Sequence, residues 1–418
     1  MKRTAAFVQE HLKDDTARLI LNKAKWPGIN IDLAVSCIES RSKLKNKVQD
    51  WYDNPELVFP VRLSAEQCSS SATAIYKARL AAEIAGEDMR LADLTGGLGV
   101  DSWYFAKFAS EVLYNEMQEA LCKAAEYNFK ELGTNNIIIS NLEIQPDSQK
   151  LEELLQKFAP DIVFIDPARR SETGKKVFLI EDCTPDVLTL RKNIFTHCRH
   201  LLIKLSPMAD ITMVCSRLGP ACREVHVVGA GGECKELLIW MDREWEGEYT
   251  ITAAELPATY PASAAITLSD NPEALSFRAP EGTTVISSER SESRDLFLFE
   301  PGKAIMKAGF FNLIRDRFDI EKMGVSTHYY LTDSPQKVQE LKKYGKIYRI
   351  LSIHPLDKRS IKEAGKTYPH SEVTARNIPM DTETLRKKLG VTSGDDAHIF
   401  GLKSDKSGNL LIITRKEL

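Results

Sequence analysis

Apolar residues recur at helical spacing in the first part of the chain. The pattern predicts helices on both sides of Pro27-Gly28 and a third helical segment over residues 65–85. Ser64 precedes that segment and Gln67 lies three residues further on, a pair typical of a helix amino-terminal cap. We therefore expect a helical amino-terminal region over residues 1–87.

From residue 90 onward the pattern changes to short apolar runs that alternate with helical stretches. We expect strands at 90–94, 112–115, 137–140, 162–165 and 201–205, and a final hairpin formed by 225–228 and 237–240. We expect helices ending near 108 and spanning 117–132, 149–158 and 186–198. This alternation predicts an α/β fold with right-handed crossovers and a mostly parallel sheet over residues 88–250.

The remainder of the chain differs from this α/β region. Residues 250–275 are rich in Ala, Thr, Pro and Ser, which is typical of a linker or covering loop. A compact α+β unit should follow up to residue 325, so we group 251–325 as linker plus small domain. The pattern over residues 326–418 predicts a second α+β unit, with strands at 329–331, 347–351 and 410–414.

Composition places the chain among ordinary globular proteins. Of its 418 residues, 43% are hydrophobic and 28% charged. No apolar run approaches the roughly 18 residues of a membrane span, and polar residues follow the first few positions before a signal-peptide core could form. The eight cysteines form no CxxC pair, which favours reduced thiols over disulfides or zinc ligands. We expect a cytoplasmic protein without membrane or metal partners.

The charge is unevenly distributed. Residues 326–418 carry 17 Lys and Arg against 11 Asp and Glu, whereas residues 1–325 carry 39 against 48. A basic carboxy-terminal module on an acidic body suggests a polyanionic partner. A solvated lysine-rich surface explains the same distribution.

A glycine-rich turn follows the first predicted strand, with glycines at 96, 97 and 99. Such a turn lets the backbone approach a ligand closely. An NAD site would instead show G-x-G-x-x-G, and the pyrophosphate bound there would be repelled by Asp93 at the strand end. S-adenosylmethionine carries an ammonium and a sulfonium, for which a nearby carboxylate is favourable.

Two further polar residues follow the next strands. Glu116 lies 23 residues after Asp93, where a carboxylate can accept both ribose hydroxyls, and Asn141 could bond the adenine edge. Taken singly, Asp93 could be a helix cap and Glu116 a solvated surface residue. The three motifs in register favour a cofactor site.

A third motif, Asp166-Pro167-Ala168-Arg169-Arg170, follows the strand at 162–165. In a parallel sheet this loop lies beside the ligand crevice. We expect Asp166 to orient or deprotonate a methyl acceptor, and Arg169 and Arg170 to hold a substrate phosphate or carboxylate. Salt bridges from the arginines to Glu181 or Asp182 are the alternative. Lys204 ends the fifth predicted strand at the same edge, where we expect it either to contact the substrate or to form a surface ion pair.

These motifs together resemble those of class I S-adenosylmethionine-dependent methyltransferases, which implies a Rossmann-like, seven-stranded core. Thr95 stands where that class has its first glycine. The resemblance implies cofactor binding by Asp93, Thr95, Gly96, Gly97, Gly99, Glu116, Asn141 and Asp166. The motif at 166 also resembles the Asp/Asn-Pro-Pro-aromatic motif of amino-group methyltransferases, which implies catalytic roles for Asp166, Pro167 and Arg169. Ala168 and Arg169 depart from that motif.

Segments Leu63–Ser70, Asp93–Gly97, Asp166–Arg170 and Cys234–Leu237 are similar to those of one bacterial methyltransferase family, which carries a ferredoxin-like domain and a carboxy-terminal THUMP-like domain. THUMP-like domains accompany RNA-modifying enzymes, so the resemblance implies tRNA or rRNA as substrate and Lys358 and Arg359 as phosphate contacts. RNA uridine C5-methyltransferases need a cysteine after the fifth strand, where this chain has Lys204-Leu-Ser-Pro207, so we expect direct in-line transfer. A protein or small-molecule methyltransferase, and a non-catalytic nucleic-acid-binding protein with a cofactor-sized pocket, stay open.

Overall fold

The computed structural model describes the chain except for residues 146–147, 170–178, 257–274, 278–294 and 418. The chain divides into two compact units, the first made mainly of Met1–Thr252 and the second mainly of Glu273–Leu418. Each unit is described by itself. Within the described residues, no helix combines the length and the apolar character that a membrane span requires.

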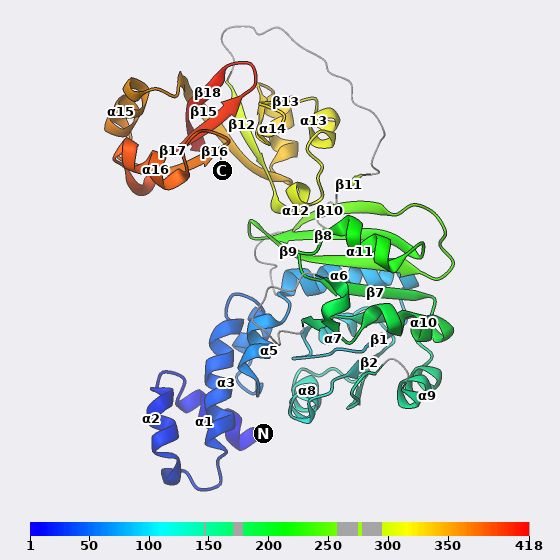
Figure 1. The fold of residues 1–418 in the computed structure, drawn as a ribbon. Coiled ribbons are helices and arrows are strands. Elements are labelled where there is room, and N and C mark those ends of the chain that lie inside the picture. The colour runs from blue at the N-terminus through cyan, green and yellow to red at the C-terminus, as the bar shows by residue number, and fades with distance from the viewer. Residues whose placement is uncertain (146–147, 170–178, 257–274, 278–294, 418) are drawn as a thin grey trace. The chain divides into compact units, whose positions relative to one another are not determined.

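The first unit begins with the expected helical region (Figure 1). Its helices are α1 (Lys2–Glu10), α2 (Thr16–Leu21), α3 (Ile31–Leu44), α4 (Gln49–Asp53), α5 (Arg62–Gln67) and α6 (Ser71–Ala85), with one 3₁₀ turn at Lys23–Lys25. The expected single helix over 65–85 is wrong, because the chain is interrupted between α5 and α6. The Ser64 cap is wrong for the same reason: Ser64 lies inside α5, and the Ser70 hydroxyl accepts the Thr73 N–H at 3.3 Å to cap α6.

One nine-stranded sheet contains the strands of the first unit, and its last two strands in sequence lie within residues 250–277, where the chain passes from the first unit to the second. Its strands are β1 (Arg90–Asp93), β2 (Glu111–Asn115), β3 (Ile137–Ser140), β4 (Ile162–Ile165), β7 (His200–Leu205), β8 (Cys222–Ala230), β9 (Glu233–Asp242), β10 (Thr250–Leu256) and β11 (Leu275–Phe277). The order is β11-β10-β8-β9-β7-β4-β1-β2-β3. The first seven strands in sequence are the predicted ones, parallel except for β9, and the predicted β8–β9 hairpin is confirmed.

The linker expected from residue 250 is wrong for its first part. Thr250–Leu256 forms β10, because Thr252, Ala253, Ala254 and Leu256 bury their side chains. Residues 257–274 lie outside the described chain.

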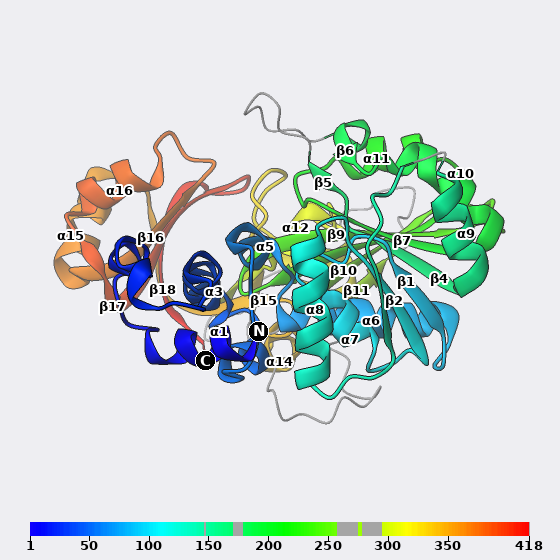
Figure 2. The ribbon, with the colours of Figure 1, turned by 90° about the horizontal axis from the view of Figure 1, so that it is seen from below.

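Helices cover both faces of this sheet (Figure 2). They are α7 (Val100–Phe105), α8 (Glu119–Glu131), α9 (Gln149–Phe158), α10 (Val187–His197) and α11 (Ile211–Leu218), together with α6. Figure 2 shows α6, α7 and α8 on one side of the strands and α9, α10 and α11 on the other. Every residue of the central strand β4 is buried, as its uninterrupted apolar run predicts. Beyond β4, a two-stranded ribbon joins β5 (Ala168–Arg169) to β6 (Cys183–Thr184), which a 3₁₀ turn at Ile180–Asp182 precedes.

The second unit contains one seven-stranded sheet. The two α+β units expected from the sequence therefore contribute their strands to a single sheet. The strands are β12 (Phe297–Pro301), β13 (Glu321–Lys322), β14 (Tyr330–Thr332), β15 (Gly345–Pro355), β16 (His370–Arg376), β17 (Thr392–Ser404) and β18 (Gly408–Lys416). The order is β13-β14-β12-β15-β18-β17-β16. The helices are α12 (Lys303–Lys307), α13 (Leu313–Phe318), α14 (Pro335–Leu341), α15 (Lys358–Thr367) and α16 (Thr382–Leu389).

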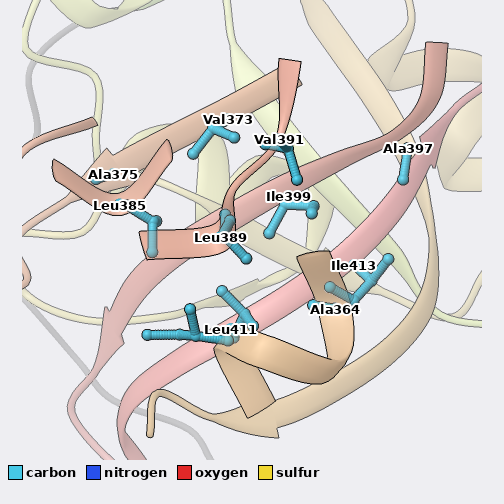
Figure 3. Packing of buried hydrophobic residues seen from close by; sticks show 11 residues of the cluster. Ala364, Val373, Ala375, Leu385, Leu389, Val391, Ala397, Ile399, Leu411 and Ile413 are labelled. Carbon is cyan, nitrogen blue, oxygen red and sulfur yellow. The ribbon is translucent and has the colours of Figure 1, made fainter. Parts of the chain in front are cut away.

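Helices α15 and α16 pack against one another and against this sheet through an apolar cluster (Figure 3). Ala364 of α15 and Leu385 of α16 meet Ile399 and Ile413 of the strands in it. At Gly365 the two helices approach so closely that a Cβ would lie 1.8 Å from the Leu389 carbonyl oxygen. The apolar sides of both helices are therefore used for packing, and their lysine side chains and Arg359 are exposed.

Candidate active site at the carboxyl edge of the first sheet

The glycine-rich turn connects β1 to α7 and packs against β2. A Cβ at position 96 would lie 2.3 Å from the Tyr114 ring, so the turn can come this close to β2 only with glycine there. Gly97 and Gly99 have φ of +54° and +92°, a conformation that glycine adopts without strain. The Tyr114 hydroxyl donates to the Gly97 carbonyl at 2.7 Å and fixes the turn from below.

Asp93 lies beneath this turn, with only 1% of its surface exposed. Its Oδ1 accepts the Thr95 N–H at 3.1 Å and its Oδ2 accepts the Ser102 hydroxyl at 2.5 Å. Burial raises the pKa of Asp93 to about 7, with Asp101 and Asp166 adding to the shift and the two hydrogen bonds opposing it. Asp93 therefore braces the turn directly, and any effect on a ligand acts through the turn.

Thr95, the departure from the family's first glycine, has a partner of its own. Its hydroxyl accepts the Asp166 N–H at 2.6 Å, which ties the turn after β1 to the loop after β4. A glycine could not make this bond.

Glu116 and Asn141 follow β2 and β3 at the same edge. Glu116 is 8% exposed, and its two oxygens accept the Gly97 N–H at 3.0 Å and the Gln118 N–H at 2.9 Å. The Asn141 amide donates to the carbonyls of Glu116 and Met117 at 2.7 and 3.0 Å. The structure thus joins Glu116 to the glycine turn, and Asn141 holds the backbone around Glu116.

Asp166 and Lys204 form an ion pair across adjacent strands. Ile165 is in register with Ile203, so Asp166 and Lys204 each follow by one residue. The Asp166 side chain is 36% exposed and that of Lys204 is 14% exposed. Burial lowers the pKa of Lys204, but the carboxylates of Asp166, Glu236 and Asp101 outweigh burial and the pKa lies above its ordinary value. Lys204 is therefore a fixed cation beside Asp166.

The remaining sequence-predicted residues are placed less completely. Pro167 is buried directly after Asp166, and the backbone of Arg169 belongs to β5. The side chain of Arg169 and the whole of Arg170 lie outside the described residues. Glu181, an alternative partner for the arginines, pairs with Arg217 at 2.9 Å. Lys358 and Arg359 lie exposed on α15 of the second unit, where Arg359 pairs with Glu363 at 3.0 Å.

Sequence reasoning gave no role to Lys77 and Asp101, two charged residues that lie behind Asp166 and meet Glu236 there. Lys77 of α6 contacts Glu236 of β9 at 2.8 Å and Asp101 of α7 at 3.2 Å. Ser69 donates to Asp101 at 2.8 Å. The one available signal was a lysine in the middle of the alanine-rich stretch over 72–85.

A cavity of about 320 Å³ lies elsewhere, at the amino edge of the sheet. Its lining includes Asp161 before β4, His200 at the start of β7, and His197, Arg199 and Arg243. The predicted site residues are at the opposite ends of the strands, so this cavity is separate from them. Among the residues that the structure describes, His, Cys, Asp and Glu form no group of three suited to a metal ion.

Two domain families match the carboxy-terminal part of the chain. Residues 297–338 match a family described as a ferredoxin-like domain, and residues 345–416 match one described as THUMP domain-like. These matches confirm the carboxy-terminal ferredoxin-like and THUMP-like domains that the sequence predicted.

One solved structure shares this arrangement along the whole chain. It is a putative methyltransferase from Porphyromonas gingivalis W83, 25% identical, with a TM-score of 0.78, covering 100% of this chain and 98% of that one. A methyltransferase from Agrobacterium tumefaciens, described as dependent on S-adenosylmethionine, is 17% identical, with a TM-score of 0.30 over 41% of this chain and 61% of its own. The second structure, with its low TM-score, carries no argument. The first structure and the two domain families together show a class I, Rossmann-like methyltransferase fold that carries ferredoxin-like and THUMP-like domains, as the sequence predicted. No curated protein matches the chain.

Proposed function

We propose that this protein transfers a methyl group from S-adenosylmethionine directly to RNA, with tRNA and rRNA as the substrates to test. The observation that carries the proposal is the assembly at one sheet edge of the glycine turn, Glu116 and Asp166, linked through Gly97 and Thr95. That assembly belongs to a chain with the fold of a putative methyltransferase along its full length.

The chemistry of this edge suits a cationic adenosyl ligand. In the direction of a Cβ at Gly97, only the Thr95 carbonyl oxygen comes within 4 Å, at 3.8 Å, so a ligand can approach the backbone there. Each Glu116 oxygen accepts one N–H and has a lone pair left for a ribose hydroxyl. The partly exposed carboxylate of Asp166 favours the sulfonium of S-adenosylmethionine, which S-adenosylhomocysteine lacks, and would repel a pyrophosphate.

The bound cofactor would supply an electrophilic methyl group, so the chain's own contribution is mainly positioning. Asp166 is the partly exposed carboxylate of the edge and can accept a hydrogen bond from an acceptor N–H or O–H, or take its proton. Arg169 is proposed to bind a substrate phosphate. The chain has Lys204-Leu205-Ser206 where a cysteine nucleophile would stand, which supports transfer without a covalent intermediate.

RNA as the substrate is supported by the second unit. The residues matched as THUMP domain-like contain α15 and α16. Their exposed cations are Lys358, Arg359, Lys362, Lys366, Lys387 and Lys388. Lysine and arginine contacts to phosphates give affinity that does not depend on sequence.

Two measurements test the proposal. Calorimetric titration with S-adenosylhomocysteine should show one site per chain, and absence of binding would reject the methyltransferase function. Tritium from labelled cofactor should then appear in the RNA fraction of a cell extract. Label found only in proteins or metabolites would reject RNA as the substrate, and binding without any transfer would indicate a non-catalytic protein.

The assignment of Asp166 has its own test. Asp166→Ala should lower the rate of methyl transfer by about a hundredfold or more, because the acceptor loses its hydrogen-bond partner. S-adenosylhomocysteine affinity should stay near the wild-type value, since Glu116 and the glycine turn are unchanged. Unchanged turnover in single-turnover assays would reject the role of Asp166.

A further inference from the structure

A set of buried charged side chains continues inward from Asp166. Lys204 faces Asp166 directly, and Lys77 faces Glu236 at 2.8 Å and Asp101 at 3.2 Å. We call these five residues the buried charge array. They come from β7, the loop after β4, α6, β9 and α7, so the array joins the amino-terminal helices to the carboxyl edge of the sheet.

Exposure within the array falls steadily away from Asp166. The exposed fractions of the side chains are 36% for Asp166, 14% for Lys204, 12% for Asp101, 4% for Glu236 and 0% for Lys77. Taking such ions out of water costs free energy that their attraction only partly offsets, and apolar residues of similar size often serve stability equally well. Stability alone therefore gives a weak reason for this array.

Lys204 is near three carboxylates but pairs with one. Asp166, Glu236 and Asp101 all stabilise the Lys204 ammonium, although its ion pair is with Asp166. Lys77 contacts the other two carboxylates, and Ser69 both donates to Asp101 at 2.8 Å and accepts from Lys77 at 2.9 Å. Without Lys77, Glu236 and Asp101 would be uncompensated and would compete with Asp166 for Lys204.

We infer that Lys204 is a positioning residue that holds the Asp166 carboxylate towards the methyl acceptor, and that Lys77 keeps Lys204 available by neutralising Glu236 and Asp101. This inference rests on the proposed function. It assigns Lys204 a role through Asp166 instead of a direct substrate contact. It also makes α6, which precedes the Rossmann-like core, part of the catalytic machinery.

The first test removes the Lys204 ammonium with Lys204→Met. The rate at saturating cofactor should fall about 10- to 100-fold, because Asp166 loses its fixed orientation, while S-adenosylhomocysteine affinity stays within about twofold. Lys204→Met should add nothing to the loss caused by Asp166→Asn, because both act through one group. Lys123→Met is the matched control, since Lys123 pairs with Glu119 on the surface of α8. A wild-type rate in Lys204→Met, or losses that multiply in the double variant, would overturn the inference.

The second test addresses Lys77, which has no exposed surface. Lys77→Met should slow transfer because Glu236 then draws Lys204 away from Asp166. The double variant Lys77→Met, Glu236→Gln should transfer methyl groups at least tenfold faster than Lys77→Met alone, since the competing carboxylate is gone. A double variant that folds, binds S-adenosylhomocysteine and stays as slow as Lys77→Met would overturn the role of Lys77.

Failure of the proposed function can be distinguished from failure of this inference. If the wild-type protein transfers no label to any fraction, the proposed function fails. The pairing is then measured by urea unfolding of Asp166→Asn, Lys204→Met and the double variant. Coupled effects on stability would support the pairing, and additive effects would overturn it.

Discussion

At the scale of single residues, the tightest constraint in the first unit is the contact between Gly96 and Tyr114. A methyl group at position 96 would lie 2.3 Å from a ring that its own hydroxyl anchors to Gly97 at 2.7 Å. The turn must therefore shift in Gly96→Ala, at a cost of about 1–3 kcal/mol. We predict that S-adenosylhomocysteine affinity, measured by calorimetry, falls by roughly tenfold or more.

Gly133→Ala is the control for this substitution. Gly133 follows α8 with φ of +70°, and no atom lies within 4 Å of the position that an alanine methyl group would take, so alanine there strains only the helix end. That variant should lose some stability and keep its cofactor affinity. Equal affinities for Gly96→Ala and wild type would show that the turn does not contact the ligand.

A second residue-scale prediction concerns Asp93, whose pKa is raised to about 7, chiefly by burial. The ordinary value of an unfolded Asp is about 3.9. Between these values the folded protein binds more protons at Asp93 than the unfolded chain does, so stability falls as pH rises from about 4 to about 7. Asp93→Asn lacks this titration. The difference in unfolding free energy, wild type minus variant, should therefore decrease over that pH range in urea denaturation and level off above it.

The hydrogen bonds that Asp93→Asn loses change the unfolding free energy by an amount that does not vary with pH. A difference that stays flat from about pH 4 to about pH 8 would show that the Asp93 carboxyl keeps an ordinary pKa. A difference that increases with pH would show that its hydrogen bonds to Thr95 and Ser102 outweigh burial.

At the scale of elements, the strands were the most predictable part of the fold. Residues 137–139 and 162–165 are apolar runs bounded by polar residues. Strand β4 has those limits, and β3 extends one residue further, to Ser140. The start of α6 was mispredicted because Ser64 and Ser70 both match a cap preceding an apolar stretch. Only the interruption at residues 68–70, where Lys47 Nζ donates to the Cys68 carbonyl at 2.9 Å, decides between them. That contact depends on tertiary structure.

The corrected cap gives an element-scale prediction. Ser70→Ala should destabilise the protein by about 1 kcal/mol, because the Thr73 N–H loses its acceptor at the first turn of α6. Ser64→Ala should cost much less, since Ser64 lies inside α5 and caps no helix in the structure. Urea midpoints of the two variants make the comparison. A larger loss for Ser64→Ala would restore the single-helix interpretation of residues 65–85.

At the scale of the whole molecule, the candidate site was predictable where residues directly follow strands. Parallel strands bring their carboxyl ends to one edge, so Asp93, Glu116 and Asp166 could be grouped from sequence order alone. The buried charge array could not be, because Lys77 and Glu236 are 159 residues apart and meet only through the packing of α6 on the sheet. The tertiary fold determines which residues they contact, and no local sequence pattern around either residue indicates the pairing.

The second unit leads to the last prediction, which concerns RNA affinity. Lys358, Arg359 and Lys362 are exposed on α15, whose apolar side packs against α16 and the sheet. Replacing all three by alanine should leave the fold intact and weaken RNA binding. Each lost phosphate contact lowers the slope of log affinity against log salt by about 0.7 to 0.9, so three lost contacts should lower it by roughly 2 to 3. The exposed Lys130, Lys150 and Lys157 of α8 and α9 provide a control variant of equal charge change. Equal slopes for the two triple variants in filter-binding titrations would mean that α15 is no RNA contact, and that any RNA affinity comes from elsewhere on the chain.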